Sequence, residues 1–260
     1  MKPVLEVNQL HVALNSRKRN YELVKGVVFS VMLGECLGIL GESGSGKSTM
    51  GRVLCGLLKP DSSKVLLNNV PVYASKSGRR ELQNKLSIVF QDYTTSANPR
   101  FRVCDILKEG LYVRQRREPV RFHWESEINR LLELVGLPSD FAERFPHELS
   151  GGQLQRVCIA RAVACNPEII LFDEAISSLD AHTQVQIMDL LLELKEKLAL
   201  TYIFITHDLT SITHLCDDVL FLYQGHVTEY LLVKRINETK DAYAKKLLKS
   251  IVVFDTEEAV

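Results

Sequence analysis

Residues 41 to 49 have the types and the spacing that hold the phosphates of a nucleotide. Gly41, Gly46, Lys47 and Ser48 fill the fixed positions of the pattern G-x-x-x-x-G-K-[ST]. Glycines let the main chain approach a phosphate closely, and the amide groups of such a loop point toward the anion. The lysine reaches the outer phosphates, and the serine hydroxyl is a ligand for Mg2+. The predicted site for a nucleoside triphosphate therefore comprises Gly41, Glu42, Ser43, Gly44, Ser45, Gly46, Lys47, Ser48 and Thr49.

Two carboxylates, Asp173 and Glu174, follow the apolar run 169–172. The carboxyl ends of parallel strands open onto the ligand crevice, so both side chains are expected to face the phosphates. Asp173 suits the binding of Mg2+ through water. Glu174 suits the polarisation or deprotonation of an attacking water, which needs a carboxylate within hydrogen-bond reach. The pair predicts phosphoryl transfer to water.

A second glycine-rich helix start follows at Leu149-Ser150-Gly151-Gly152-Gln153, with Ser150 as the expected N-cap. The N-terminus of a helix is a further anion site. One nucleotide rarely needs two such cradles in a single chain, and the alternative is a capped helix whose glycines serve packing. Both interpretations stay open on the residues alone.

The elements that position these residues follow from hydrophobic periodicity. Strands are predicted at 4–12, 23–31, 64–67, 70–73, 86–90, 168–172, 202–205 and 219–222. The first two are expected to pair antiparallel, and Asn68-Asn69 forms the turn of a hairpin. Residues 102–164 show helical periodicity, and further helices are predicted at 50–58 and 181–198. Strands that alternate with helices predict an α/β fold with a mainly parallel sheet.

Composition limits the class of protein. The chain has 260 residues, 46% of them apolar, which is enough to bury a core. Because 32 basic residues balance 32 acidic ones, no overall field favours nucleic acid, and the arginines at 114–117 are expected on a solvated helix face or against a membrane partner. The sequence shows no membrane span and no signal peptide, which predicts a cytosolic location. The six scattered cysteines are expected to be reduced core residues.

Six features follow one another along the chain: the phosphate loop, Gln91, the motif 149–153, the strand end 169–174, Asp180 and His207. In this order, they resemble the nucleotide-binding subunit of an ATP-binding cassette (ABC) transporter, over about residues 3–230. The resemblance implies ATP and Mg2+ as ligands. It assigns catalysis to Glu174, His207 and Gln91. Further nucleotide contacts are implied for Ser150, Gly151, Gly152, Gln153 and Asp180, and Mg2+ binding for Ser48, Gln91 and Asp173.

The resemblance also implies the domain organisation. It predicts one nucleotide-binding domain, 1–260, with the fold of a P-loop ATPase. A RecA-like core at 1–100 and 166–230 would include an N-terminal antiparallel β subdomain. An α-helical subdomain with the 149–153 motif would cover 101–165, and a helical tail would cover 231–260.

Assembly follows from the same resemblance. Two subunits would pack head to tail, so that the phosphate loop of one faces the 149–153 motif of the other. The implied partners are a second ATPase subunit, expected to be a paralogue, two integral membrane permease subunits and an extracytoplasmic solute-binding protein, without nucleic acid. The chain would then lie at the cytoplasmic face of the cell membrane.

The segment Ser96-Ala97-Asn98-Pro99-Arg100 resembles the peptide and nickel importers of this family, and residues 149–162 and 173–180 are most similar to nickel-import ATPases of the NikE type. Peptide-importing members of this family commonly have a cysteine-containing C-terminal region, and no cysteine follows Cys216 here, so the resemblance implies nickel or another chelated metal as cargo. The alternatives are a dipeptide, oligopeptide or other metallophore importer, and a soluble cassette protein acting on nucleic acid or ribosomes. The residue that stacks on adenine stays open between Leu14 and Tyr21.

Overall fold

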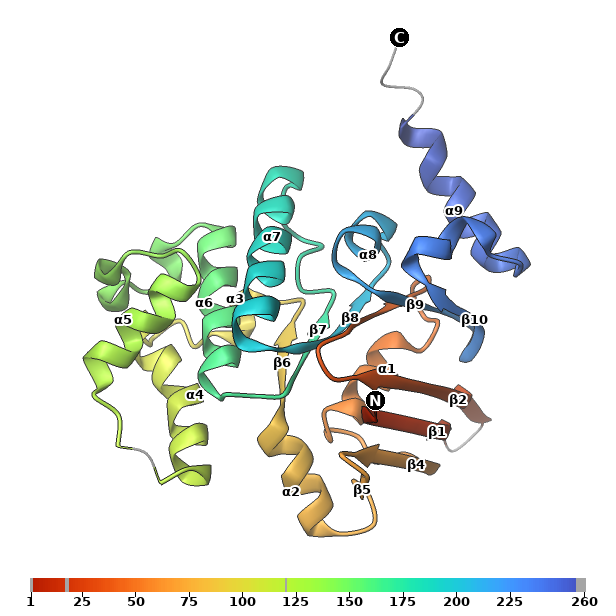
Figure 1. Ribbon diagram of the computed structural model, residues 1–260, viewed down its shortest axis with the longest axis horizontal. Helices are drawn as coiled ribbons and strands as arrows, with labels where there is room; N and C mark the ends of the chain where they lie inside the picture. Colours follow the sequence, from red (N-terminus) through yellow and green to blue (C-terminus); the bar gives the residue numbers. More distant parts are fainter. Residues whose placement is uncertain (1, 17–18, 120, 256–260) are drawn as a thin grey trace. The chain divides into compact units, whose positions relative to one another are not determined.

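The computed structural model describes residues 2–16, 19–119 and 121–255, and the chain divides into two compact units (Figure 1). The first unit contains residues 1–79 and 203–260, and the second contains residues 80–202. The three-part domain division expected from the sequence follows other boundaries and stays a prediction. Helix α2 (Lys76–Lys85) and strand β8 (Thr201–Thr206) contain the boundaries between the units.

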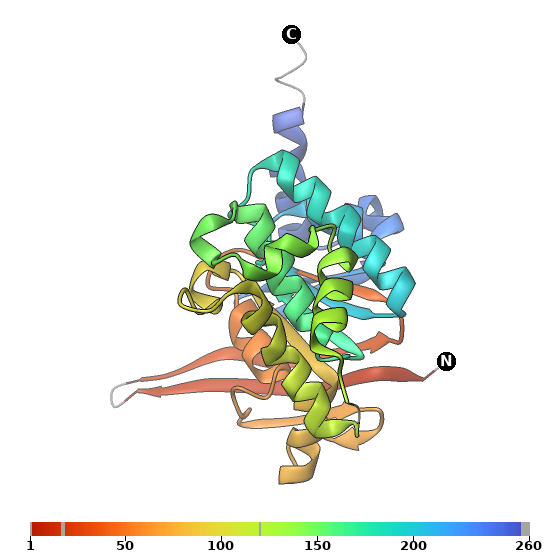
Figure 2. The ribbon, with the colours of Figure 1, turned by 90° about the vertical axis from the view of Figure 1, so that its left-hand side faces the viewer.

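The antiparallel sheet of the first unit has the strand order β2-β1-β4-β5. Its strands are β1 (Pro3–Ser16), β2 (Arg19–Met32), β4 (Ser62–Leu67) and β5 (Val70–Pro71). The long β1–β2 pair is visible edge-on in Figure 2. Asn68 and Asn69 join β4 to β5 with φ values of 48° and 64°, the left-handed conformation that a two-residue hairpin turn requires. The predicted pairing of the first two strands and the predicted hairpin are confirmed.

The first unit also holds the strands that lead to the phosphate loop. β3 (Cys36–Leu40) is buried along its whole length and pairs in parallel with β9 (Asp218–Tyr223), and β10 (His226–Leu232) pairs antiparallel with β9. The strand order is β10-β9-β3-β8. The helical elements of this unit are α1 (Lys47–Leu54), α8 (Leu209–Leu215), η3 (Val233–Glu238) and α9 (Ala242–Asp255).

Two sequence expectations need adjustment in this region. The predicted helix 50–58 is α1, which begins at Lys47, inside the phosphate motif, and ends at Leu54. The expected helical tail, 231–260, begins with the last two residues of β10, so helical structure starts at Val233, and residues 256–260 lie outside the described part. β10 itself is half-exposed and lacks the apolar run that marks a buried strand.

The second unit combines two parallel strands with a cluster of helices. β6 (Leu86–Phe90) pairs in parallel with β7 (Ile169–Asp173). The helices are α3 (Tyr93–Ser96), α4 (Val103–Arg117), α5 (Trp124–Leu134), η1 (Ser139–Glu143), η2 (Pro146–Glu148), α6 (Gly151–Ala164) and α7 (Ala181–Leu198). The predicted helical region 102–164 and the helix 181–198 are confirmed. α4 and α6 pack closely, because a Cβ atom at Gly110 would lie 2.4 Å from the carbonyl oxygen of Arg161.

The arginines of α4 correct one expectation. Arg114 and Arg117 do not lie on a solvated face, since their side chains are only 23% and 20% exposed. Arg117 donates to the carbonyl oxygens of Cys165 and Asn166 at 3.1 and 3.0 Å, and Arg114 pairs with Glu118 at 3.0 Å. Arg117 therefore joins the end of α6 to α4, whereas Arg114 pairs with carboxylates and Arg116 is exposed, as the charge pattern predicts. Within the described residues, the helices include none that is long and apolar enough to cross a membrane.

Candidate nucleotide site

The phosphate loop connects the buried strand β3 to α1. Gly44 and Gly46 have φ values of 79° and 107°, which side chains rarely adopt. At Gly46, the N-cap of α1, a Cβ atom would also lie 2.6 Å from the carbonyl oxygen of Leu23 in β2. The loop therefore passes close to β2 before the helix starts, and the first amides of α1 face outward from this turn as a helix N-terminus does.

The turn between β9 and β10 supports the same loop. The amide of Gly225 donates to the carbonyl oxygen of Ser45 at 2.9 Å, and a Cβ atom at Gly41 would lie 2.3 Å from the carbonyl oxygen of Leu222. Residues far along the chain, in the β9–β10 turn, thus hold the loop in its position. Sequence reasoning missed this support, because nothing in the run Leu222–Gly225 except the glycine indicates it.

Lys47 is nearly fully buried, and its ammonium group lies against carbonyl groups of its own loop. Nζ donates to the carbonyl oxygens of Gly41 and Glu42 at 2.6 and 2.9 Å. The hydroxyl oxygen of Ser45 is buried and has no hydrogen-bond partner among the described residues. A loop with a buried cation, an unpaired hydroxyl and outward amides has the donor set that a polyphosphate requires, so the residues present fit the expected ligand.

His207 belongs to the same unit as the loop. It follows β8, the neighbour of β3 in the strand order, and is exposed. Asp208 directly after it caps α8 by accepting from the amides of Thr210 and Ser211 at 3.0 and 2.9 Å. The strand end and the capped helix therefore fix the backbone on both sides of His207.

The second unit brings Gln91, Asp173 and Glu174 to one edge of its strand pair. β6 and β7 are in register with Phe90 opposite Asp173, so Gln91 and Glu174 both follow directly after the paired residues. Glu174 has a φ value of 49°, a strained conformation for a residue with a side chain, and its carbonyl oxygen accepts from the Ser177 hydroxyl at 2.9 Å. Strain of this kind concentrates at functional sites.

Ser150 is the N-cap of α6, as the sequence predicts. Its hydroxyl accepts from the amide of Gln153 at 3.3 Å, while the Gln153 side chain accepts from the amide of Ser150 at 2.9 Å, which completes a capping box. A Cβ atom at Gly151 would lie 2.7 Å from the Tyr93 hydroxyl, and one at Gly152 would lie 2.5 Å from the Thr183 methyl carbon. The interpretation of these glycines as packing residues therefore has direct support.

Asp180 is the N-cap of α7, and its hydrogen-bond partner Thr183 lies beside the start of α6. Its carboxylate accepts from the amide and the hydroxyl of Thr183 at 2.9 and 2.7 Å, and these hydrogen bonds lower the pKa of Asp180, the one from the hydroxyl most. Thr183 in turn contacts the Gly152 position. A groove of about 440 Å3 opens at the same place, lined in part by Ser150, Gly152 and Arg156.

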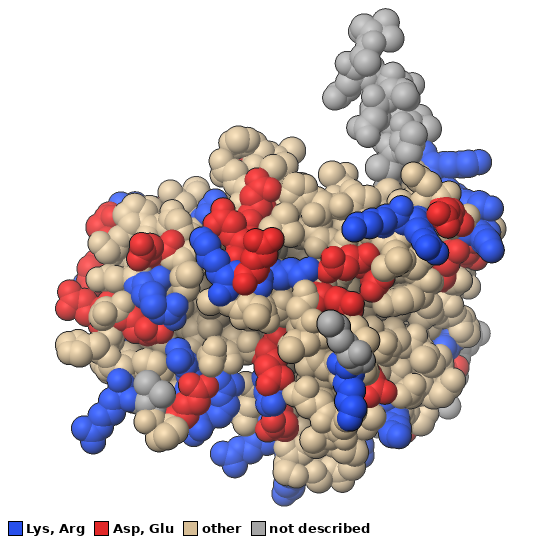
Figure 3. Space-filling view, viewed as in Figure 1, with Lys and Arg blue, Asp and Glu red and all other residues tan. Residues whose placement is uncertain are grey.

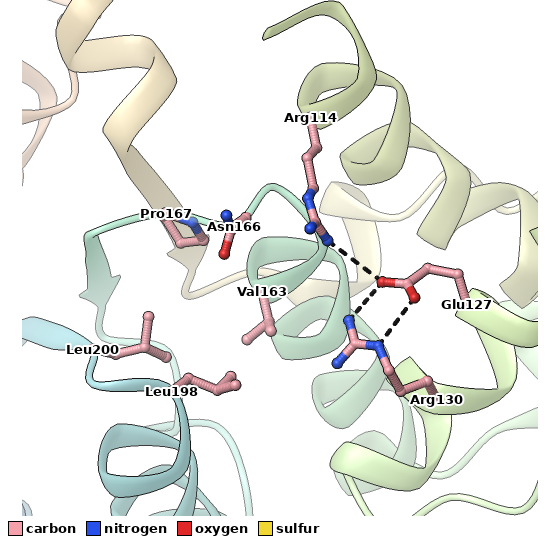
Figure 4. Close-up of a pocket in the computed structure, with 8 residues that line it drawn as sticks. All are labelled: Arg114, Glu127, Arg130, Val163, Asn166, Pro167, Leu198 and Leu200. Atoms are coloured by element: carbon pink, nitrogen blue, oxygen red, sulfur yellow. Dashed lines mark hydrogen bonds and ion pairs between the residues drawn. The ribbon is translucent and has the colours of Figure 1, made fainter. Parts of the chain in front are cut away.

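A separate cavity of about 270 Å3 lies elsewhere in the second unit, as Figure 4 shows. Glu127 lies between two arginines there, 2.6 Å from Arg130 and 3.5 Å from Arg114. One carboxylate offsets only one of the two guanidinium groups, and Arg114 also pairs with a second carboxylate, that of Glu118, at 3.0 Å. None of the site residues predicted from the sequence lines it.

The predicted site residues thus fall into two sets. The phosphate loop and His207 belong to the first unit. Gln91, the two carboxylates, the α6 start and Asp180 belong to the second. Within each unit the structure places the members at strand ends or helix starts, where sequence reasoning expects them.

Comparison with known proteins decides the family. Residues 24–177 match the family model described as ABC transporter. The chain belongs to this family. It is 42% identical over 238 residues, 92% of this chain and 93% of the relative, to the metal-staphylopine import system ATP-binding protein CntF of Staphylococcus aureus. It is 38% identical over 255 residues, 97% of this chain and 83% of the relative, to the oligopeptide transport ATP-binding protein OppF of Bacillus subtilis.

Solved structures agree on the fold. The ATP-binding cassette MJ0796, in a dimeric post-hydrolysis state bound to ADP and Pi, superposes with a TM-score of 0.77 at 27% identity over 88% of this chain and 98% of that one. The subunit cbiO1 from Clostridium perfringens, part of the transporter complex cbiONQ, gives a TM-score of 0.80 at 27% identity over 99% of this chain and 100% of that one. The chain has the α/β fold of an ABC ATPase, and it is an ATPase of this family.

Proposed function

We propose that this chain is the ATP-hydrolysing subunit of a membrane importer for a chelated metal, with nickel or a nickel chelate as the expected cargo. The observation that carries the proposal is the phosphate loop, preformed around a buried Lys47 in a chain that is 42% identical to a metal-staphylopine import protein over 92% of its length. The relative OppF supports the alternative, a peptide importer, as does the segment at 96–100. A particular similarity to nickel-import ATPases stays a prediction.

The residues of the chain fit distinct tasks in hydrolysis. The loop amides and Lys47 hold and orient the phosphates, and Ser48, Asp173 and Gln91 are the groups that would hold Mg2+. Bound Mg2+ would supply charge neutralisation for the phosphates. In this proposal Glu174, which follows a strand end, accepts the proton of the attacking water, and His207 contacts the outermost phosphate. Phosphoryl transfer to water needs alignment and charge stabilisation more than covalent chemistry, which suits this set.

A second subunit would complete the site. The α6 start offers a second anion-binding helix N-terminus, centred on Ser150, which a single nucleotide in this chain does not require. A dimer is the state in which the MJ0796 cassette holds ADP and Pi. We therefore expect a second ATPase subunit, a paralogue, together with two permease subunits and a solute-binding protein at the cytoplasmic face of the cell membrane. Acidic and basic side chains are interspersed on the face shown in Figure 3, which favours this function over nucleic-acid binding.

Tyr21 is our proposal for the residue that stacks on the adenine. Leu14 and Tyr21 are opposite each other in the β1–β2 register, with 57% and 53% of each residue exposed. Leu23, whose carbonyl oxygen approaches the Gly46 position, lies two residues further along β2, at an irregularity in the β1–β2 register. Of the two candidates, the tyrosine ring offers a flat face to a base.

Uptake measurements test this function. Cells that lack the chain should lose uptake of free nickel, of a nickel chelate or of a dipeptide, each measured separately with a labelled substrate. Restoration by the wild-type chain, but not by Glu174→Gln, would tie uptake to hydrolysis. Loss of dipeptide uptake alone would replace the metal cargo with a peptide. Intact uptake of all three, with the chain recovered on ribosomes rather than with an integral membrane protein, would contradict the proposal.

A further inference from the structure

The peptide group between Gly41 and Glu42 is held from both of its polar ends. Its carbonyl oxygen, on Gly41, accepts the hydrogen bond from the buried ammonium of Lys47 at 2.6 Å. Its N–H group, on Glu42, donates to the phenol oxygen of Tyr243 at 2.9 Å. Tyr243 lies on α9, two hundred residues further along the chain but in the same compact unit. The orientation of the first peptide of the phosphate loop is therefore set by Lys47 on one side and by α9 on the other.

The ring of Tyr243 has a fixed place of its own. It stacks on the ring of Tyr223, the last residue of β9, with centroids 4.3 Å apart and an angle of 30° between the planes. Burial raises the pKa of the Tyr243 phenol above its usual value, so the hydroxyl is neutral at physiological pH. The stack leaves the Tyr243 hydroxyl beside the loop, while the Tyr223 hydroxyl instead accepts from the side chain of Gln224 at 3.2 Å.

A carboxylate on β10 also holds the start of α9 in place through hydrogen bonds. Glu229 accepts from the amides of Lys240 and Asp241 at 2.9 and 3.2 Å and from the hydroxyl of Thr239. Asp241 then caps α9 by accepting from the amide of Tyr243 at 3.0 Å. Hydrogen bonds thus link β10 to the turn before α9 and α9 to the phosphate loop. Figure 1 shows the course of β10 and α9 in the chain.

We propose that Tyr243 is a positioning residue for nucleotide binding, which aligns the phosphate loop by fixing the Gly41–Glu42 peptide. The inference rests on the proposed binding of nucleotide by this loop. A loop aligned before the ligand arrives loses less conformational entropy on binding, so its affinity is higher. Because the phenol touches only the start of the loop, its effect falls on binding of the phosphates shared by ATP and ADP, and not on the hydrolytic step at the carboxylates.

The matched pair Tyr243→Phe and Tyr223→Phe tests this. Each variant loses one hydroxyl from the same ring stack, but only the first loses the hydrogen bond to the loop. Dissociation constants for ATP and ADP with Mg2+, measured by calorimetry on the full chain, should rise about two- to tenfold for Tyr243→Phe, the worth of one hydrogen bond. Tyr223→Phe should bind like the wild type. Turnover at saturating ATP should stay within about twofold in both variants, which separates binding from catalysis.

Amide hydrogen exchange provides a readout that a purely structural role would not change. In the nucleotide-free chain, exchange of the Glu42 amide should accelerate in Tyr243→Phe and not in Tyr223→Phe, at equal thermal stability. Unchanged affinity and exchange in Tyr243→Phe, or equal shifts in both variants, would overturn the inference. If Tyr243→Phe does not fold, Glu229→Gln should show a smaller shift of the same sign, and no shift would also overturn it. Failure of the wild type to bind ATP, or wild-type binding by Lys47→Ala, would instead contradict the proposed nucleotide site.

Discussion

Replacing Gly41 with alanine tests whether the β9–β10 turn sets the position of the phosphate loop. The new methyl carbon would lie 2.3 Å from the carbonyl oxygen of Leu222 and 2.8 Å from the Ser45 hydroxyl. Leu222 is fully buried within β9, so its backbone has little freedom to give way. Overpacking of this kind costs about 1–3 kcal/mol. For a chain of this size, each kcal/mol lowers the Tm by roughly 2–4 °C.

We expect the substitution to reduce the rate of ATP hydrolysis by more than its loss of stability alone would cause. The loop has to move by roughly an ångström to relieve the contact, and a displacement of that size costs about 100-fold in rate. Gly34→Ala is the control, because Gly34 has a φ value of 82° with no atom within 4 Å of its added methyl group, so it loses about 1 kcal/mol from backbone strain alone. Thermal unfolding and the rate of ATP hydrolysis would be measured on both variants. The reasoning is refuted if Gly41→Ala hydrolyses ATP as fast as Gly34→Ala.

Three other substitutions test separate parts of the account. Tyr21→Ala should weaken ATP binding about fivefold through the lost stacking, leave competition by inorganic triphosphate unchanged and exceed the effect of Leu14→Ala; equal effects would remove Tyr21 from its role. Ser150→Ala removes the cap of α6 and should lower the free energy of unfolding by about 1 kcal/mol in urea titrations, and an unchanged midpoint would contradict the cap. The pKa of Glu118 is lowered to about 2, chiefly by its hydrogen bond from Arg117, so its stabilising effect is complete above pH 4.5 and is lost as the pH falls toward 2. Glu118→Gln should therefore reduce the pH dependence of unfolding in that window, and curves that stay parallel between pH 5 and 2.5 would refute this.

Local signals in the sequence determine much of this fold. The strand 86–90 and the helix 181–198 have the predicted bounds, because apolar periodicity and a capping aspartate mark them. The cap at Ser150 follows in the same way from its own residue and from Gln153. In contrast, no apolar pattern predicts α2, since its sequence is strongly polar and Leu82 is its one deeply buried apolar side chain.

The features that the sequence does not predict depend on contacts between residues far apart in the chain. The register that aligns Gln91 with Glu174 depends on pairing between strands about eighty residues apart, which no local pattern encodes. The support of the loop by Gly225 and Tyr243 likewise appears only when the chain is folded. The charge pattern also predicts a solvated Arg117, because its carbonyl partners, at the end of α6, cannot be read from neighbouring residues.

ATP turnover by the membrane complex, purified through this chain, tests the central claim most directly. The account predicts that Glu174→Gln reduces turnover by at least about 100-fold, because the attacking water loses its proton acceptor. The complex with this variant should still bind ATP with Mg2+ and retain it unhydrolysed. Wild-type turnover by Glu174→Gln, in a complex whose second ATPase subunit has been inactivated, would contradict the assignment of this strand-end carboxylate as the catalytic group.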